Sequence, residues 1–164
     1  MHMETSYIVT ADTEESIAKI ASLWGYEFAE IDNCSFEVEG EDSQILDTME
    51  RVMKVVHRME TECDKANFRI LGFGETDYDY TLFVIDYSGT EPMIKAHLSG
   101  PDIDEEEYES FRNADYDEIP GLLESDPYMT FEQAIDDENY EGDYPLGGFV
   151  NMTYEEWHSS VIEK

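Results

Sequence analysis

Carboxylates dominate the chemistry available to this chain, because 41 of its 164 residues are Asp or Glu. Paired carboxylates can serve as general acid and base, but at this density neighbouring pairs arise by chance. The histidines lack ligand spacing, so we expect no zinc site with Cys34 or Cys63. Gly72-Phe73-Gly74 leads into a strand pattern, whereas a dinucleotide fingerprint leads into a helix. We therefore expect no enzymatic activity and no cofactor.

One segment has a partial metal-binding pattern. Asp137, Asn139, Glu141 and Gly142 match the first half of an EF-hand loop, but the twelfth position is Gly148, where the loop needs Glu. A dedicated calcium site is therefore not expected. Loose binding of divalent cations by an acidic surface stays open as an alternative.

The densest acidic stretch is residues 102–143, with 17 Asp or Glu and a single basic residue, Arg112. Chains this acidic often fail to fold, because little apolar surface offsets the entropy of ordering. Here large apolar side chains recur at short intervals and can anchor the backbone, which predicts a fixed array of carboxylates. These apolar residues are Ile103, Tyr108, Phe111, Tyr116, Ile119, Leu122, Leu123, Tyr128, Met129, Phe131, Ile135 and Tyr140.

Four tyrosines alternate with these acidic residues, namely Tyr108, Tyr116, Tyr128 and Tyr140. In an interface they would supply rigid contact area beside the charges. We expect at least half of them to pack in the core instead.

The formal net charge of −32 bounds the choice of partner. Such a field repels nucleic acid and anionic membranes and attracts basic proteins with salt-sensitive association. Adaptation to high salt is the competing explanation. It is disfavoured because Glu outnumbers Asp, 25 to 16, and because the chain has 8 Met.

The charge of the acidic stretch can be compared with that of DNA. B-DNA carries one negative charge per roughly 1.7 Å of axis, so 17 carboxylates match about 29 Å of duplex. In composition and size the chain resembles the DNA-mimic inhibitors that phages and mobile elements direct against restriction enzymes, CRISPR effectors or uracil-DNA glycosylase. The resemblance implies a non-enzymatic inhibitor that blocks the DNA- or RNA-binding site of a bacterial defence nuclease, of anti-CRISPR or anti-restriction type.

The partner would then be a basic nucleic-acid-binding protein or ribonucleoprotein complex in the cytoplasm of a bacterial host cell, without direct binding of nucleic acid. The candidate partner-binding residues are Asp102, Asp104, Glu105, Glu106, Glu107, Glu109, Asp115, Asp117, Glu118, Glu124, Asp126, Asp136, Asp137, Glu138, Glu141 and Asp143. Two alternatives stay open: an immunity or antitoxin protein that neutralises a basic toxin, and an acidic protein that binds divalent cations.

The elements that must position these residues follow from periodicity. Residues 7–10 predict a strand, and Asp12 with Glu15 predicts a capping box for a helix that ends at Gly25. Trp24 lies on the apolar face of that helix and is expected in the core. Residues 26–31 and 35–39 predict a hairpin with Phe28, Phe36 and Val38 facing inward.

The clearest helix is expected from Asp42 or Ser43 to about Glu60, because it has one broad apolar stripe. Five of the nine basic residues lie on its far side or just after it. Salt bridges and the helix dipole are one explanation, and a small anion site is the other. These residues are Arg51, Lys54, Arg58, Lys65 and Arg69.

Residues 67–74, 78–87 and 93–98 alternate with period two and predict an antiparallel meander. The order of elements predicts an α+β fold, with a ferredoxin-like β-α-β-β-α-β core extended by this meander. Further along, capping patterns at Asp104, Thr130 and Thr153 predict an acidic region of short helices and loops, and a last helix that folds back on the sheet.

We therefore expect residues 3–100 to form a scaffold and residues 101–164 to form an acidic extension on the same core. One compact domain is preferred over two. The two cysteines are too few for a disulfide framework, so reduced thiols are expected, and no apolar run is long enough to span a membrane.

Overall fold

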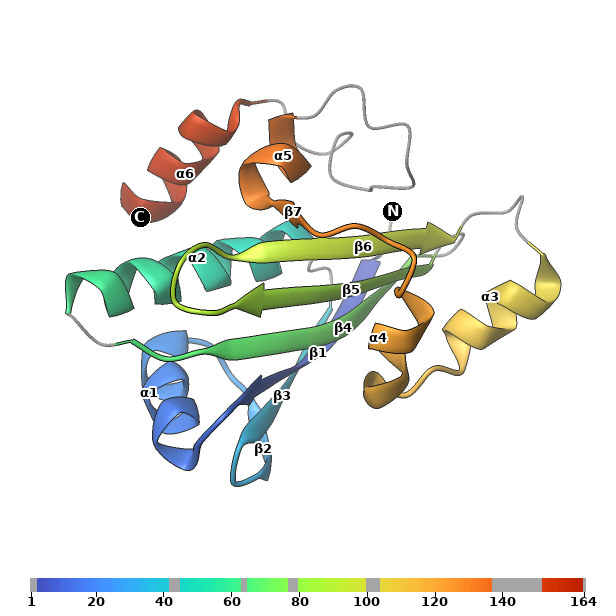
Figure 1. The fold of residues 1–164 in the computed structure, drawn as a ribbon, viewed down its shortest axis with the longest axis horizontal. Coiled ribbons are helices and arrows are strands. Elements are labelled where there is room, and N and C mark those ends of the chain that lie inside the picture. The colour runs from blue at the N-terminus through green and yellow to red at the C-terminus, as the bar shows by residue number, and fades with distance from the viewer. Residues whose placement is uncertain are drawn as a thin grey trace.

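The fold is mixed α+β, with seven strands in one antiparallel sheet (Figure 1). The computed structural model describes residues 3–41, 45–62, 65–76, 80–99, 104–136 and 152–163. The strands are β1 (Met3–Ala11), β2 (Ala29–Asp32), β3 (Ser35–Glu41), β4 (Phe68–Thr76), β5 (Tyr80–Tyr87), β6 (Met93–Ser99) and β7 (Met129–Thr130). The helices are α1 (Glu14–Trp24), α2 (Ile45–Thr61), α3 (Glu105–Arg112), the 3-10 helix η1 (Tyr116–Glu118), α4 (Ile119–Leu122), α5 (Phe131–Asp136) and α6 (Tyr154–Glu163).

The strand order is β2-β3-β1-β4-β5-β6-β7. β1 therefore lies between β3 and β4, and Tyr7 pairs with Val38 on one side and with Gly72 on the other. The predicted meander is confirmed as β4, β5 and β6, which pair antiparallel in sequence order. β7 adds a two-residue strand beside β6 that periodicity did not predict.

α1 begins at a different cap from the predicted one. The Thr13 hydroxyl accepts a hydrogen bond from the Ser16 amide at 3.1 Å, so Thr13 is the N-cap, and the predicted pairing of Asp12 with Glu15 is wrong. Glu15 lies in the first turn of the helix, 3.9 Å from Lys19. Its end is as predicted, since Gly25 has φ 74°, a left-handed conformation that favours glycine.

The hairpin of β2 and β3 differs from the prediction at its first strand. Phe36 and Val38 are buried as expected, but Phe28 is 37% exposed and precedes β2, which starts only at Ala29. The reason is position: β2 is an edge strand whose four residues are all exposed. The Phe28 ring can therefore only lie against the rim of the core, 4.4 Å from the Phe36 ring.

α2 carries the apolar stripe that the sequence predicts, with Met49, Val52 and Val56 buried. Its expected start at residues 42 and 43 lies outside the described residues. The larger core forms between α1, α2 and one face of the sheet. This core includes Tyr7, Val9, Trp24, Phe36, Met49, Ile70, Phe83, Ile85 and Ile94.

The opposite face of the sheet carries a second, smaller core. Since side chains alternate along a strand, neighbouring residues of β5 reach different faces. Phe83 and Ile85 belong to the larger core, whereas Leu82 and Val84 belong to the smaller one. The smaller core consists of Tyr80, Leu82, Val84, Phe111, Ile119 and Leu123.

The chain covers both faces after β6. Residues of α3 and α4 pack in the smaller core, then β7 runs along the edge of β6, and α5 and α6 pack in the larger core. α6 folds back against α2 and α5, and its buried Trp157 and Val161 belong to the larger core.

The caps of the short helices are partly as predicted. Thr130 and Gln133 form a reciprocal capping box, with hydrogen bonds of 2.9 and 3.1 Å. Asp104 caps α3 by accepting from the Glu106 amide at 2.8 Å, but Glu107 lies 3.7 Å from His97 rather than over the cap. No helix in the described ranges is both long and apolar enough to cross a bilayer.

Candidate functional site

Eleven of the sixteen predicted site residues lie in the described ranges. They are Asp104, Glu105, Glu106, Glu107, Glu109, Asp115, Asp117, Glu118, Glu124, Asp126 and Asp136, and all except Asp126 are exposed. Asp102, Asp137, Glu138, Glu141 and Asp143 lie outside the described residues, as does the partial EF-hand pattern.

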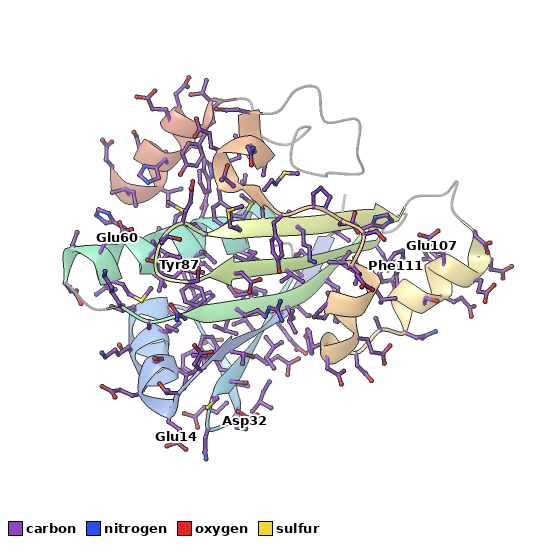
Figure 2. The ribbon with its side chains drawn as sticks, in the orientation of Figure 1. Glu14, Asp32, Glu60, Tyr87, Glu107 and Phe111 are labelled. Atoms are coloured by element: carbon purple, nitrogen blue, oxygen red, sulfur yellow. The ribbon has the colours of Figure 1, made fainter. Side chains whose placement is uncertain are left out.

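Most of the described acidic residues belong to a segment whose backbone is anchored by side chains in the smaller core. Phe111, Ile119 and Leu123 are at most 6% exposed and pack against β5 in the smaller core. Figure 2 shows Phe111 and Glu107 at the α3 end of the molecule, far from Glu14 on α1. The anchor restricts the backbone of α3, η1 and α4, so the carboxylates of α3 and η1 are held in place.

Two tyrosines of the acidic segment contribute to the same anchor. The Tyr108 ring meets the Tyr80 ring edge-on at 5.3 Å, and the Tyr116 ring stacks on Phe73 at 5.3 Å. Both are half-buried against the smaller core. Their role is therefore packing, as we expected for at least half of these tyrosines.

Three carboxylates of α3 point away from this core. Glu105, Glu106 and Glu109 are exposed on the outer side of the helix, and the first two lie in its first turn. Carboxylates are favourable there, because the N-terminal end of a helix carries partial positive charge. Glu107 is used differently, since it faces the His97 imidazole on β6.

A second group of carboxylates lies in and just before η1. Asp115, Asp117 and Glu118 are exposed, and each offers an oxygen within 4.8 Å of the others. Carboxylates at that separation repel one another. Oxygen ligands of this kind suit a divalent cation, so these three residues are the candidate metal ligands in the described part of the chain.

Tyr116 connects η1 with β3. Its hydroxyl donates a hydrogen bond to Glu37 at 3.1 Å. Burial raises the pKa of Tyr116, and the negative charges of Glu37 and Glu39 raise it further. Two acidic residues of β3 therefore lie beside η1, and neither is among the predicted site residues.

The alternation of β3 contains part of that signal. Glu37 and Glu39 alternate with Phe36 and Val38, so the two carboxylates had to face away from the larger core. The sequence does not show that η1 covers that face. We define the acidic face as Glu37, Glu39, Glu105, Glu106, Glu109, Asp115, Asp117 and Glu118.

The structure does not bring all predicted residues to this face. Asp136 lies on α5, over the larger core, and accepts a hydrogen bond from the Tyr154 amide at 2.7 Å. Asp126 is half-buried, with its carboxylate 3.4 Å from Nδ1 of His97. These two carboxylates have structural partners, which makes them poor candidates for contact with another molecule.

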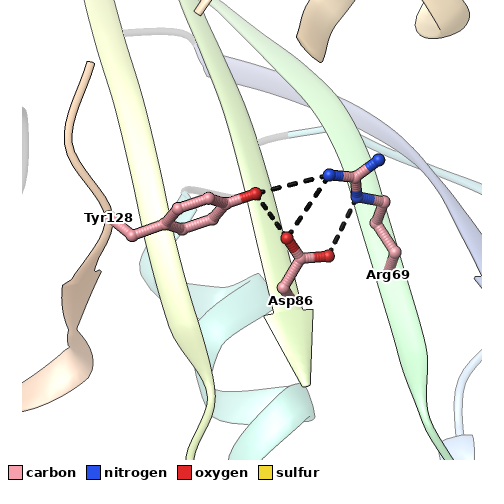
Figure 3. A network of polar contacts seen from close by, with 3 residues as sticks. All are labelled: Arg69, Asp86 and Tyr128. Atoms are coloured by element: carbon pink, nitrogen blue, oxygen red, sulfur yellow. Dashed lines mark hydrogen bonds and ion pairs between the residues drawn. The ribbon is translucent and has the colours of Figure 1, made fainter. Parts of the chain in front are cut away.

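A polar network fixes the segment between α4 and β7 on the open part of the sheet (Figure 3). Arg69 on β4 donates to Asp86 on β5 at 2.9 and 3.4 Å, and Tyr128 donates to the same carboxylate. The Lys95 ammonium lies 4.6 Å from the centre of the Tyr128 ring. Two cations on this face of the sheet are therefore already engaged.

Comparisons with models of protein families, with curated proteins and with solved structures give no significant match.

Proposed function

We propose that this protein is a non-enzymatic inhibitor that presents its acidic face in place of nucleic acid. The target would be a basic nucleic-acid-binding protein, with a bacterial defence nuclease of restriction or CRISPR type preferred. The observation that carries the proposal is the pairing of exposed carboxylates with a packed anchor on α3, η1 and α4. A flexible acidic tail would have to be ordered on binding, and this arrangement avoids most of that entropic cost.

The charge of the acidic face is comparable to that of a short stretch of duplex. Its eight carboxylates carry the charge of about 14 Å of B-DNA. Arg and Lys side chains that grip phosphates can accept carboxylates as charge-assisted hydrogen-bond acceptors. Association should release counterions, as phosphate binding does, and should therefore weaken steeply with salt.

The rest of the chain would act as the scaffold. The strand order β2-β3-β1-β4 with α1 and α2 supports a ferredoxin-like unit, which β5 and β6 extend into the meander. The following acidic region would then pack on the same sheet to give one compact domain. The proposed place of action is the cytoplasm of a bacterial host, and the proposed source is a phage or mobile element.

A competition assay tests the proposal directly. Purified restriction and CRISPR nucleases are each loaded with a fluorescent duplex or guide RNA, and displacement by this protein is followed by anisotropy. The proposal predicts that at least one nuclease releases its nucleic acid, and that the inhibitor is not cleaved. If no nuclease of the panel binds the protein at low salt, the proposal is wrong.

Two other functions would use the same surface. An immunity or antitoxin protein would block one basic toxin instead of a nuclease, and a toxin gene next to this gene would favour that function. Cation binding is favoured by the closeness of Asp115, Asp117 and Glu118. Calorimetry with calcium and magnesium separates it from mimicry, because a dedicated site gives saturable binding that Asp117→Asn removes.

A further inference from the structure

A pocket of about 360 Å³ lies between the end of α1, the last two turns of α2, and α6. These helices pack in the larger core, whereas the acidic face lies over the other face of the sheet. The pocket is lined by Lys54, His57 and Arg58. Its volume falls in the range of about 300–1,000 Å³ that is usual for ligand sites.

The basic lining is unusual for this chain, which has 9 Lys and Arg against 41 acidic residues. Lys54, His57 and Arg58 stand at positions i, i+3 and i+4 of α2, so they share one side of the helix, and the like charges of Lys54 and Arg58 repel each other there. Within the described residues, no carboxylate forms an ion pair with His57 or Arg58. An anionic ligand would relieve this repulsion.

The helix dipole explains only part of the cluster. Arg58 lies in the last turn of α2, where a cation is favourable. Lys54 lies about two turns before the end at Thr61, and the dipole effect fades within the last turn. The dipole therefore does not explain the position of Lys54.

Contacts within the protein hold the side chains of Tyr26 and Lys54 at one side of the pocket. The Arg51 guanidinium stacks 4.1 Å from the centre of the Tyr26 ring and donates a 2.6 Å hydrogen bond to the buried Tyr7 hydroxyl. Lys54 in turn donates to the Tyr26 hydroxyl at 3.3 Å. These contacts place the Lys54 ammonium at the pocket before any ligand arrives, which lowers the entropic cost of binding.

The rest of the pocket is lined by apolar side chains and by a glycine. Trp24 and Val161 are almost completely buried and, with Ile162, give the pocket an apolar side. Gly25 turns the chain between Trp24 and Tyr26, and a Cβ atom added there would meet no atom within 4 Å. The space beside the glycine is therefore free for a ligand.

We propose that this pocket binds a small organic anion, with a phosphate or carboxylate at Lys54, His57 and Arg58 and an apolar body against Trp24 and Val161. Charge-assisted hydrogen bonds from Lys54 and Arg58 supply the anion selectivity. The site is independent of the proposed inhibitory function, because it uses other elements on the other face of the sheet.

The test uses phenyl phosphate as the probe and the two indole N–H signals in the NMR spectrum of the full chain as the readout. The expected result is a saturable shift of the Trp24 signal, while the signal of Trp157, which is outside the pocket lining, stays in place. Phenol and inorganic phosphate should each bind at least about tenfold more weakly than phenyl phosphate, because each has only half of the recognised chemistry. Benzoate in a parallel titration distinguishes carboxylate from phosphate preference.

Lys54→Met with Arg58→Met should weaken phenyl phosphate binding by at least about tenfold, since two charge-assisted contacts are lost. Lys65→Met removes the same type of charge outside the pocket lining and is the control. Arg58→Met alone, at an exposed position, serves if the double variant does not fold. The proposal is overturned if Trp24 shows no saturable shift, if phenol binds equally well, or if the variants that lack these charges keep full affinity.

Discussion

The two faces of the sheet bury their apolar residues in different ways. One face is covered by α1 and α2, which are 11 and 17 residues long, and by α5 and α6. The other is covered by α3, η1 and α4, which are 8, 3 and 4 residues long, over a smaller core. The acidic face lies on the side with the smaller core.

This difference shows how a dense set of like charges can be held without a large core. α3 and α4 each contribute a deeply buried residue, Phe111 and Ile119, and the carboxylates of α3 and η1 are exposed. The larger core then carries most of the hydrophobic stabilisation, which scales with buried apolar area. Stability and charge display are thus assigned to different faces.

The largest expected effect comes from removing the anchor of α3. Phe111→Ala should cost about 3 kcal/mol, because it leaves a cavity in the smaller core. The loss should be local, so that hydrogen exchange speeds up in α3 while the amides of β1 and β4 stay protected.

Phe83→Ala is the matched control for that experiment, since Phe83 is fully buried in the larger core. It should unfold the whole domain at lower denaturant. Equal exchange patterns for the two variants would show that the faces are not separate units of stability.

Alkaline pH should destabilise the cores on both faces of the sheet. Burial raises the pKa of Tyr7 in the larger core to about 12, and burial together with Glu75 raises the pKa of Tyr80 in the smaller core to about 12. In the unfolded chain a phenol ionises near pH 10. The free energy of unfolding should therefore fall as pH rises from about 10 to 12, because only the unfolded state loses these protons.

Tyr7→Phe and Tyr80→Phe divide that pH dependence between the faces, and each variant should reduce the loss of stability over this range. Denaturant titrations across the range measure it. Phenolate absorbance that develops fully near pH 10 while the protein stays folded would contradict the expectation.

The sequence predicted the individual helices and strands better than the way in which they pack together. Periodicity identified the stripe of α2 and the strands of the meander, because both patterns are local. It could not place Glu37 beside Tyr116, since 79 residues separate them and the contact depends on which face η1 covers.

The same limit explains why the predicted site is divided. Asp104 and Asp136 belong to one acidic run in the sequence, but β7 carries the chain along the edge of β6, and the two residues end on different faces. Phe28 shows a second limit. Alternation predicts that it faces inward, but the edge position of β2 leaves little core for it to enter.

A smaller loss of stability is expected at Tyr128, where the chain passes from one face of the sheet to the other. Tyr128→Phe removes the hydroxyl that donates to Asp86 and accepts from Arg69, which should cost about 1 kcal/mol. A double-mutant cycle with Asp86→Asn measures the coupling between these residues. If the stability losses of Tyr128→Phe and Asp86→Asn simply add, the hydrogen bond between these residues does not hold the segment on the sheet.

The smallest effect on stability should come from the carboxylates of η1. Asp115→Asn, Asp117→Asn and Glu118→Gln together relieve repulsion within 4.8 Å, so thermal unfolding should show equal or slightly higher stability, by a few tenths of a kcal/mol. Nuclease binding should nevertheless weaken. A clear loss of stability would mean that these residues support the fold instead of serving an interface.

The most direct test of the central claim is the salt dependence of nuclease binding for two matched charge reversals. Glu105→Lys with Glu106→Lys changes the acidic face, and Glu14→Lys with Glu15→Lys changes α1. Both pairs lie in the first turn of a helix, so their effects on helix stability should be similar. The measurement uses the nuclease with the strongest displacement in the competition assay.

For the unmodified protein, the logarithm of affinity should fall linearly with the logarithm of salt concentration. The Glu105 and Glu106 reversal should lower affinity at low salt by at least about tenfold and make the slope shallower, whereas the Glu14 and Glu15 reversal should leave both within about twofold. An equal loss for both pairs, or a greater loss for the α1 pair, would contradict the assignment of binding to the acidic face.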